Sequence, residues 1–255
     1  CHDRSGSRET APPEYNHYFA TKLIRIATCA AELPGAGAFY RRARRAGCYV
    51  TCGHSNASWT EMQQAFDAGV RHVDHFWSVM STSTTIKQRL GRPAQGSMDQ
   101  FVLFNREMAT QIIADGMHRA PELMMFALRM LGVERLLLVT DCSRALDMPP
   151  GRYRFGSKRW GTWFEAGENV GHVPGDPIAL ASALRGMDHM IGVMVRQAGA
   201  AVYEAVRMAS LTPAQRLGID REVGSLCRGK RADIVVMSKA FKAMRTIIGG
   251  EECID

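Results

Sequence analysis

A strand–helix alternation that begins at Thr21 and repeats five times constrains the fold of this chain more than any other feature. The predicted strands cover residues 22–28, 48–52, 70–75, 110–118 and 135–141. The last run is almost continuously apolar, as a parallel strand buried on both faces requires. The order therefore predicts an α/β fold of parallel βαβ units with right-handed crossovers.

Three helices are predicted between these strands, and each has its own boundary signals. One covers residues 37–46. The second begins at Ser58, which can form a capping box with Glu61. The third has Pro121 in its first turn, where a missing amide costs nothing, and an apolar stripe that runs up to Gly132.

The chain changes character after the fifth strand. Residues 147–178 are rich in glycine, proline and aromatic side chains, and we expect a hairpin excursion or an active-site loop there. Two helices and then two paired strands are predicted to follow, over residues 181–198, 200–210, 224–237 and 243–249.

Composition excludes several other classes of protein. The 255 residues are 46% hydrophobic and 22% charged, which is typical of one large or two medium globular domains. No apolar run approaches the roughly 18 residues of a membrane span. The first twenty residues show neither a signal-peptide pattern nor a clear amphipathic period, so we expect a cytoplasmic protein. The seven scattered cysteines form no CxxC pair and are interpreted as reduced thiols.

The net charge of +7 permits an anionic partner. Its densest run is the arginine cluster of residues 41–45, which at helical spacing spreads over an exposed face. No nucleic-acid signature accompanies this run, so we prefer a solvated helix face over nucleic-acid binding. A basic surface also suits an anionic substrate.

Polar side chains end four of the strand-like runs: His54, His75, His118 and Asp141. Active sites of α/β barrels lie at these strand ends. His54 and His75 could converge on one divalent metal such as zinc, since neutral imidazoles suit that ion. Asp141 could then move a proton, and His118 could polarise a carbonyl or hold a substrate. Taken singly, a residue of this kind is more often structural than functional, as we expect of His72. The position that these four residues share, at the ends of strands, favours a functional site.

Several motifs together resemble the N-acetylglucosamine-6-phosphate deacetylases of the amidohydrolase superfamily. They are GHSNAS from 53, DHFWSVM from 74, ADGMH from 114, LVTD from 138, RMASLTPAQRLGI from 207 and GSLCRGKRADIVV from 224. The resemblance covers nearly the whole chain in the right order. It implies a (β/α)8 TIM-type barrel, with about five of eight units present, and strands of a small β-sandwich. Residues 1–222 would form the partial barrel and residues 223–255 the sandwich strands.

The resemblance also implies a reaction, which is hydrolysis of an acetamido group to an amine and acetate. It makes His54 and His75 ligands of a divalent metal, most simply zinc, Asp141 the general base and then acid, and His118 a substrate-binding residue. The expected substrate is N-acetylglucosamine 6-phosphate or a related N-acetyl amino sugar. We expect a homodimer without nucleic-acid or membrane partners.

The chain departs from the family pattern on the substrate side. Ser78 stands where the family has an asparagine, and Arg92, with Arg89 as a rival, is the best match to a phosphate-binding arginine. The usual Gly-Xaa-Leu-Ala-Gly-Ser segment is altered over residues 174–182. We therefore expect the chain to keep the family's metal binding and proton transfer, and to differ from the family in how it recognises the sugar and its phosphate.

The family's third metal ligand, a glutamate in a Glu-Gly-Pro motif, has no match in this chain. We therefore expect a fragment of a longer reading frame, with three barrel strands before Cys1, weak metal binding and little turnover. Two alternatives stay open. One is another amide or cyclic-amide hydrolase of the superfamily, and the other is a non-catalytic fragment.

Overall fold

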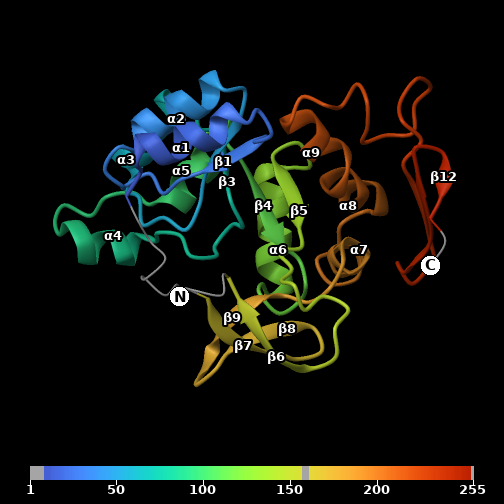
Figure 1. Ribbon diagram of the computed structural model, residues 1–255. Helices are drawn as coiled ribbons and strands as arrows, with labels where there is room; N and C mark the ends of the chain where they lie inside the picture. Colours follow the sequence, from blue (N-terminus) through green and yellow to red (C-terminus); the bar gives the residue numbers. More distant parts are fainter. Residues whose placement is uncertain (1–8, 157–160, 254–255) are drawn as a thin grey trace. The chain divides into compact units, whose positions relative to one another are not determined.

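The computed structural model describes residues 9–156 and 161–253, in two compact units, Cys1–Gln111 and Ile112–Asp255 (Figure 1). Strands β1 to β5 follow one another in a five-stranded sheet in the order β1-β2-β3-β4-β5. Two smaller sheets contain β6–β9 and β10–β12. The predicted α/β fold with five successive strands is confirmed.

The first unit contains the following elements: α1 (Pro12–Ala20), β1 (Ile26–Thr28), α2 (Ala36–Arg45), β2 (Tyr49–Cys52), α3 (Trp59–Asp67), β3 (His72–Val73), α4 (Ser83–Leu90), α5 (Met98–Phe104) and the start of β4 (Ala109–Ile113). Its strands pair in parallel, with Ala27 opposite Val50 and Val73 opposite Thr110. Strands β2 and β4 are almost wholly buried, as their apolar sequences predict.

The helices of the first unit begin where local sequence dictates. Ser58 and Glu61 form the predicted capping box at the start of α3. A second capping box, Thr82 with Thr85, starts α4. These side chains satisfy backbone amides that have no partner within the helix, which is worth about 1 kcal/mol per cap.

Helix α1 was not predicted from the sequence, because its nine residues carry little amphipathic pattern. Its position depends on aromatic contacts with α2, which the local sequence does not encode. The rings of Tyr15 and Phe19 lie 5.3 and 5.7 Å from that of Phe39. Helices α4 and α5 also lie in a stretch for which no element was predicted.

The second unit continues from the end of β4 with the following elements: α6 (Pro121–Leu131), β5 (Leu136–Val139), β6 (Gly151–Phe155), β7 (Thr162–Ala166), β8 (Val170–Val173), β9 (Asp176–Ala183), α7 (Met187–Arg196), α8 (Val202–Ala209), α9 (Leu211–Arg216), β10 (Ile234–Met237), β11 (Ala243–Ile248) and β12 (Glu251–Glu252). Strands β6–β9 form an antiparallel hairpin sheet around its own small core of Ala145, Phe164, Ala166 and Leu184. Strands β10 and β11 pair, as predicted, and their pairing is antiparallel.

The prediction of a helix from residue 181 was wrong at its start. Strand β9 extends to Ala183, and α7 begins only at Met187. The run Ala-Leu-Ala-Ser-Ala-Leu is compatible with either structure when taken alone. Pairing with β8 selects the strand, since Val170 lies opposite Ala183.

Within the described residues, no helix has the length and apolarity needed to cross a membrane. The described cysteines that are not exposed, Cys29, Cys48 and Cys52, are buried free thiols. Burial, followed by the nearby charge of Glu32, raises the pKa of Cys29 to about 11, so this thiol stays protonated at neutral pH.

Candidate metal and hydrolase site

The imidazoles of His54 and His75 face each other at the ends of β2 and β3 in the first unit. Their Nε2 atoms lie 2.8 Å apart, and the ring planes meet at 67°. Two nitrogens bound to one tetrahedral zinc at about 2.0–2.1 Å would lie about 3.3 Å apart, only slightly wider. The pair therefore fits a shared ion.

The ring of His75 is also held from its other side. Its Nδ1 lies 3.2 Å from the carbonyl oxygen of Ser78, to which an Nδ1–H can donate. Metal-binding histidines commonly donate their second ring N–H to such an acceptor, which leaves the Nε2 lone pair for the ion. His75 is 7% exposed, whereas His54 is exposed. His75 thus has the surroundings of a metal ligand.

Both histidines have left-handed backbones, with φ of 48° at His54 and 25° at His75. Trp77 and Val79, in the loop that follows His75, also have positive φ. Such a conformation is an outlier for a β-branched residue such as Val79. Each strained residue costs about 1–3 kcal/mol and persists only where its surroundings hold it. Strain of this kind clusters at functional sites.

Gly53 and Asp74 leave no room for a larger side chain beside the histidines. A Cβ on Gly53 would lie 2.5 Å from the Oδ2 atom of Asp74. The same carboxylate oxygen accepts a hydrogen bond of 3.3 Å from the hydroxyl of Thr51 on β2. The glycine before His54 is therefore required for this packing.

His72, the histidine expected to be structural, is 3% exposed on β3. Its Nε2 lies 3.2 Å from Oε1 of Gln111, and its ring packs against Tyr49. Among the residues that the structure describes, no group of three or more histidine, cysteine, aspartate or glutamate side chains is placed to hold a metal. The described residues thus bring together two imidazoles, those of His54 and His75, as candidate metal-binding side chains.

In the second unit, His118 follows β4 and is oriented by Asp115, a residue to which the sequence analysis gave no role. The Nδ1 of His118 lies 2.7 Å from Oδ2 of Asp115. The backbone N–H groups of Met117 and His118 donate to the other carboxylate oxygen. His189 on α7 adds a 3.1 Å contact from its Nε2 to the carbonyl oxygen of Asp115. The motif Ala-Asp-Gly, which precedes His118, is the sequence signal that could have pointed to Asp115.

Burial raises the pKa of Asp115, but hydrogen bonds from the side chain and backbone of His118 outweigh burial, so the pKa is lower than usual. Its carboxylate therefore stabilises the fold fully above the ordinary pKa of about 3.9, and this contribution is lost as pH falls through the lowered value.

We expect Asp115→Asn to remove this pH dependence and to cost about 1–3 kcal/mol of stability at neutral pH. Urea unfolding between about pH 5 and pH 3 checks this, because the wild-type free energy of unfolding should fall more steeply than that of the variant. Parallel curves would contradict the role assigned to this carboxylate.

Asp141 follows β5, exposed and with a left-handed backbone of φ 47°. Next to it, Cys142 forms an isolated parallel bridge with Ala183 at the end of β9. An aspartate tolerates this backbone conformation better than most residues do. The end of β5 thus presents a carboxylate on a backbone held by the hairpin sheet.

The two candidate phosphate-binding arginines differ in their surroundings. Arg89 lies against Glu61, with its Nη1 3.1 Å from Oε1 and its Nη2 in contact with Oε2. Glu61 also accepts the 2.7 Å hydrogen bond from the backbone N–H of Ser58 that caps α3. Arg92 is exposed and forms no ion pair with another described residue. Arg89 is thus engaged in a structural role that Arg92 does not share.

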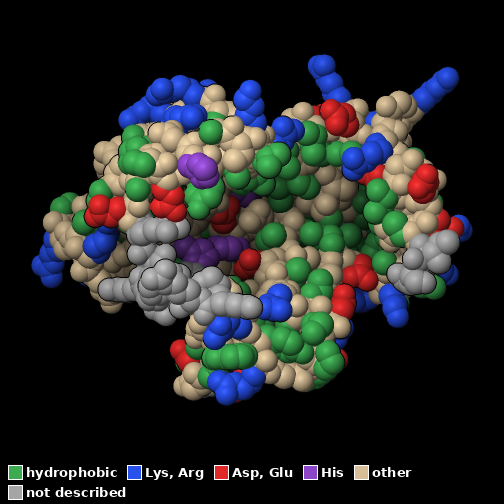
Figure 2. All heavy atoms as spheres, viewed as in Figure 1, with side chains coloured by type: hydrophobic (Ala, Val, Ile, Leu, Met, Phe, Trp, Pro, Cys, Tyr) green, Lys and Arg blue, Asp and Glu red, His purple; other side chains and the backbone are tan. Residues whose placement is uncertain are grey.

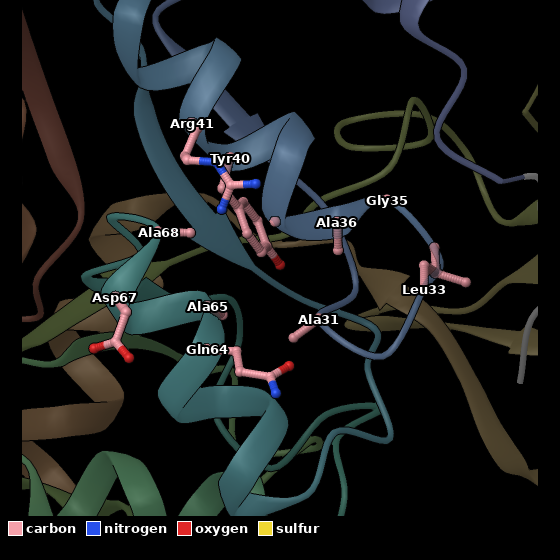
Figure 3. A pocket seen from close by; sticks show the side chains of 11 residues that line it. Ala31, Leu33, Gly35, Ala36, Tyr40, Arg41, Gln64, Ala65, Asp67 and Ala68 are labelled. Atoms are coloured by element: carbon pink, nitrogen blue, oxygen red, sulfur yellow. The ribbon is translucent and has the colours of Figure 1, made fainter.

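A pocket of about 470 Å³ lies on the helices α2 and α3 (Figure 3). Tyr40 and Arg41 line it from α2, and Gln64 and Asp67 line it from α3. None of the predicted site residues is among its lining residues. Lys and Arg side chains gather over the α1–α2 segment (Figure 2), where the arginines of α2 are mostly exposed.

Comparison with known proteins defines the class to which this fold and site belong. Residues 41–253 match the amidohydrolase family, and the chain belongs to that family. Divalent metals are general in this superfamily. The predicted family resemblance is thereby confirmed.

The individual relatives are amino-sugar-phosphate deacetylases. The chain is 31% identical over 228 residues to N-acetylgalactosamine-6-phosphate deacetylase of Escherichia coli O157:H7, covering 89% of this chain and 56% of that protein. It is 28% identical to N-acetylglucosamine-6-phosphate deacetylase of Vibrio furnissii, covering 100% of this chain and 61% of that protein. The crystal structure of the Pasteurella multocida N-acetylglucosamine-6-phosphate deacetylase matches with a TM-score of 0.88 and 25% identity, over 100% of this chain and 63% of that one. The chain thus spans less than two thirds of the length of each of these proteins.

Proposed function

We propose that this chain carries the metal- and substrate-binding portion of an amino-sugar-phosphate deacetylase, which hydrolyses the acetamido group of N-acetylglucosamine 6-phosphate or a related N-acetyl amino sugar. The observation that carries the proposal is the pair of facing imidazoles, His54 and His75, at neighbouring strand ends. Deacetylase relatives that cover most of the chain support the choice of reaction.

His54 and His75 would hold the divalent ion, for which we propose zinc. When bound, such an ion supplies Lewis-acid activation of water and of the amide carbonyl. Asp141 accepts a proton from the attacking water and returns it to the amide nitrogen as the carbon–nitrogen bond breaks. The products are the free amine and acetate, which balances the addition of one water.

His118 is proposed to contact the substrate through Nε2, because Asp115 engages its Nδ1. Ser78 and Arg92 are proposed to take part in recognition of the sugar and its phosphate. A homodimer stays a prediction, and so does a cytoplasmic location, which was expected because the first twenty residues show no signal-peptide pattern.

The test is release of acetate from N-acetylglucosamine 6-phosphate, N-acetylgalactosamine 6-phosphate and the two sugars without phosphate, with zinc added or removed by a chelator. The proposal expects zinc-dependent acetate release that is faster from a phosphorylated sugar. Zinc binding without acetate release from any of the four would favour the non-catalytic alternative. Ring opening of an added cyclic amide, with none of the four sugars hydrolysed, would favour another amidohydrolase activity.

Arginine substitutions should separate phosphate recognition from stability. We expect Arg92→Ala to raise KM for the phosphorylated sugar about tenfold, since a charge-assisted hydrogen bond is worth about 1.5–3 kcal/mol. Arg89→Ala should instead lower stability by up to about 1 kcal/mol, because its ion pair with Glu61 is partly exposed. Steady-state kinetics and thermal unfolding of both variants check this. The reverse pattern would make Arg89 the phosphate ligand.

A further inference from the structure

Glu32 lies in the loop after β1 and holds the two residues that directly follow His54. Its Oε2 accepts a 2.5 Å hydrogen bond from the hydroxyl of Ser55. Its Oε1 accepts a 2.7 Å hydrogen bond from the backbone N–H of Asn56. Both carboxylate oxygens are therefore engaged on one short segment, in the manner of a clamp.

Ser55 connects this clamp to the loop that carries His75. The Ser55 side chain is buried, and its backbone N–H donates to the carbonyl oxygen of Val79 at 3.1 Å. Its carbonyl oxygen accepts a 3.0 Å hydrogen bond from the N–H of Ser81. The hydroxyl also accepts from the N–H of Ala57 at 3.2 Å. A displacement of Ser55 would consequently affect the loops after both histidines.

These loops need an external restraint, because His54, His75 and Val79 all have left-handed backbones. Such conformations relax when the contacts that hold them are removed. His75 has its own restraint in the carbonyl of Ser78. The exposed His54 is followed directly by the segment 55–57, which Glu32 fixes by charge-assisted hydrogen bonds that are stronger than neutral ones.

We propose that Glu32 is a positioning residue of the metal site, which keeps the imidazole of His54 directed at that of His75 without itself touching the ion. The inference rests on the proposed function in one respect, namely that these two histidines bind a divalent metal. The claim that Glu32 holds the segment after His54 concerns the metal-free chain, and it depends only on the hydrogen bonds described above.

The matched test compares Glu32→Ala and Glu32→Gln with Glu107→Gln, an exposed carboxylate of the same unit that lies 3.6 Å from Arg71. Zinc affinity is measured by titration calorimetry, and the visible spectrum of bound Co²⁺ reports the coordination geometry. Amide hydrogen exchange of a peptide covering residues 53–58 is followed in metal-free protein, alongside the thermal unfolding of each variant.

We expect Glu32→Ala to weaken zinc binding about 10- to 100-fold, as loss of supporting contacts around metal ligands typically does. Glu32→Gln should lose less zinc affinity, since its carbonyl oxygen can still accept one hydrogen bond. Glu107→Gln should bind zinc with wild-type affinity. Exchange within residues 53–58 should accelerate while other peptides of the first unit stay unchanged. The Co²⁺ spectrum should change in the Glu32 variants alone.

Wild-type zinc affinity and wild-type exchange in both Glu32 variants would overturn the proposal. Exchange that accelerates over the whole first unit would also overturn it, since Glu32 would then be a general stability residue. Should Glu32→Ala fail to fold, Glu32→Gln decides. If the wild-type chain binds no zinc, the proposed function fails, but the exchange of residues 53–58 still decides whether Glu32 positions His54.

Discussion

Replacing His75 with alanine should abolish zinc binding by this chain. His75 supplies one of two facing imidazole nitrogens, so its loss leaves a single histidine ligand. The decrease in affinity should exceed the roughly 10- to 100-fold that supporting residues cost. Equilibrium dialysis followed by metal analysis of the protein measures it.

Two further variants make this result interpretable. His75 is buried, so His54→Ala provides the same test at an exposed position, and His17→Ala in α1 is the exposed control. We expect both site variants to lose zinc and the control to retain it. Zinc bound at wild-type affinity by His54→Ala and His75→Ala would place the ion elsewhere in the chain.

Replacing Asp141 with asparagine should lower acetate release about 10²- to 10⁴-fold, the usual contribution of general acid–base catalysis. The amide cannot accept the proton of the attacking water, but it keeps the size of the carboxylate and tolerates the left-handed backbone. Zinc content should stay unchanged. Initial rates with saturating zinc measure the effect.

The matched control for Asp141 is Asp147→Asn, an exposed aspartate with φ of 61° in the segment that follows. It changes the same charge on a similar backbone, so it should leave the rate unaltered. An equal fall in both variants would attribute the effect to net charge. An Asp141→Asn enzyme with full activity would assign the proton transfer to another group.

The parts of this fold that follow from local sequence were predictable. Strand β2 and helix α3 are examples, because a buried apolar run and the Ser58–Glu61 capping box carry their own boundary signals. The shared strand-end position of His54 and His75 was visible as well, since parallel strands end at one edge of a sheet. Their role as metal ligands stays a prediction.

The parts that depend on contacts between distant residues were not predictable. Glu32 meets Ser55 across 23 positions of the chain, and Arg89 meets Glu61 across 28. Neither pairing produces a periodic pattern or a motif in the sequence, because the fold of the whole chain determines which distant residues meet. The contact between Asp115 and His118 could have been predicted, since the two residues are only three positions apart.

The hairpin sheet β6–β9 has a consequence for how cooperatively the protein unfolds. Its interior consists of Ala145, Phe164, Ala166 and Leu184, with Tyr153 and Ala181 packed against them. Val170 and Ala183 of this sheet are buried as well, and three of the six buried side chains are alanines, so little apolar area would be exposed if this sheet opened. Regions of this kind open with a smaller free energy than the global value. We therefore expect the hairpin sheet to open as a separate unit. Such an opening would break the backbone bridge between Ala183 and Cys142, the residue next to Asp141.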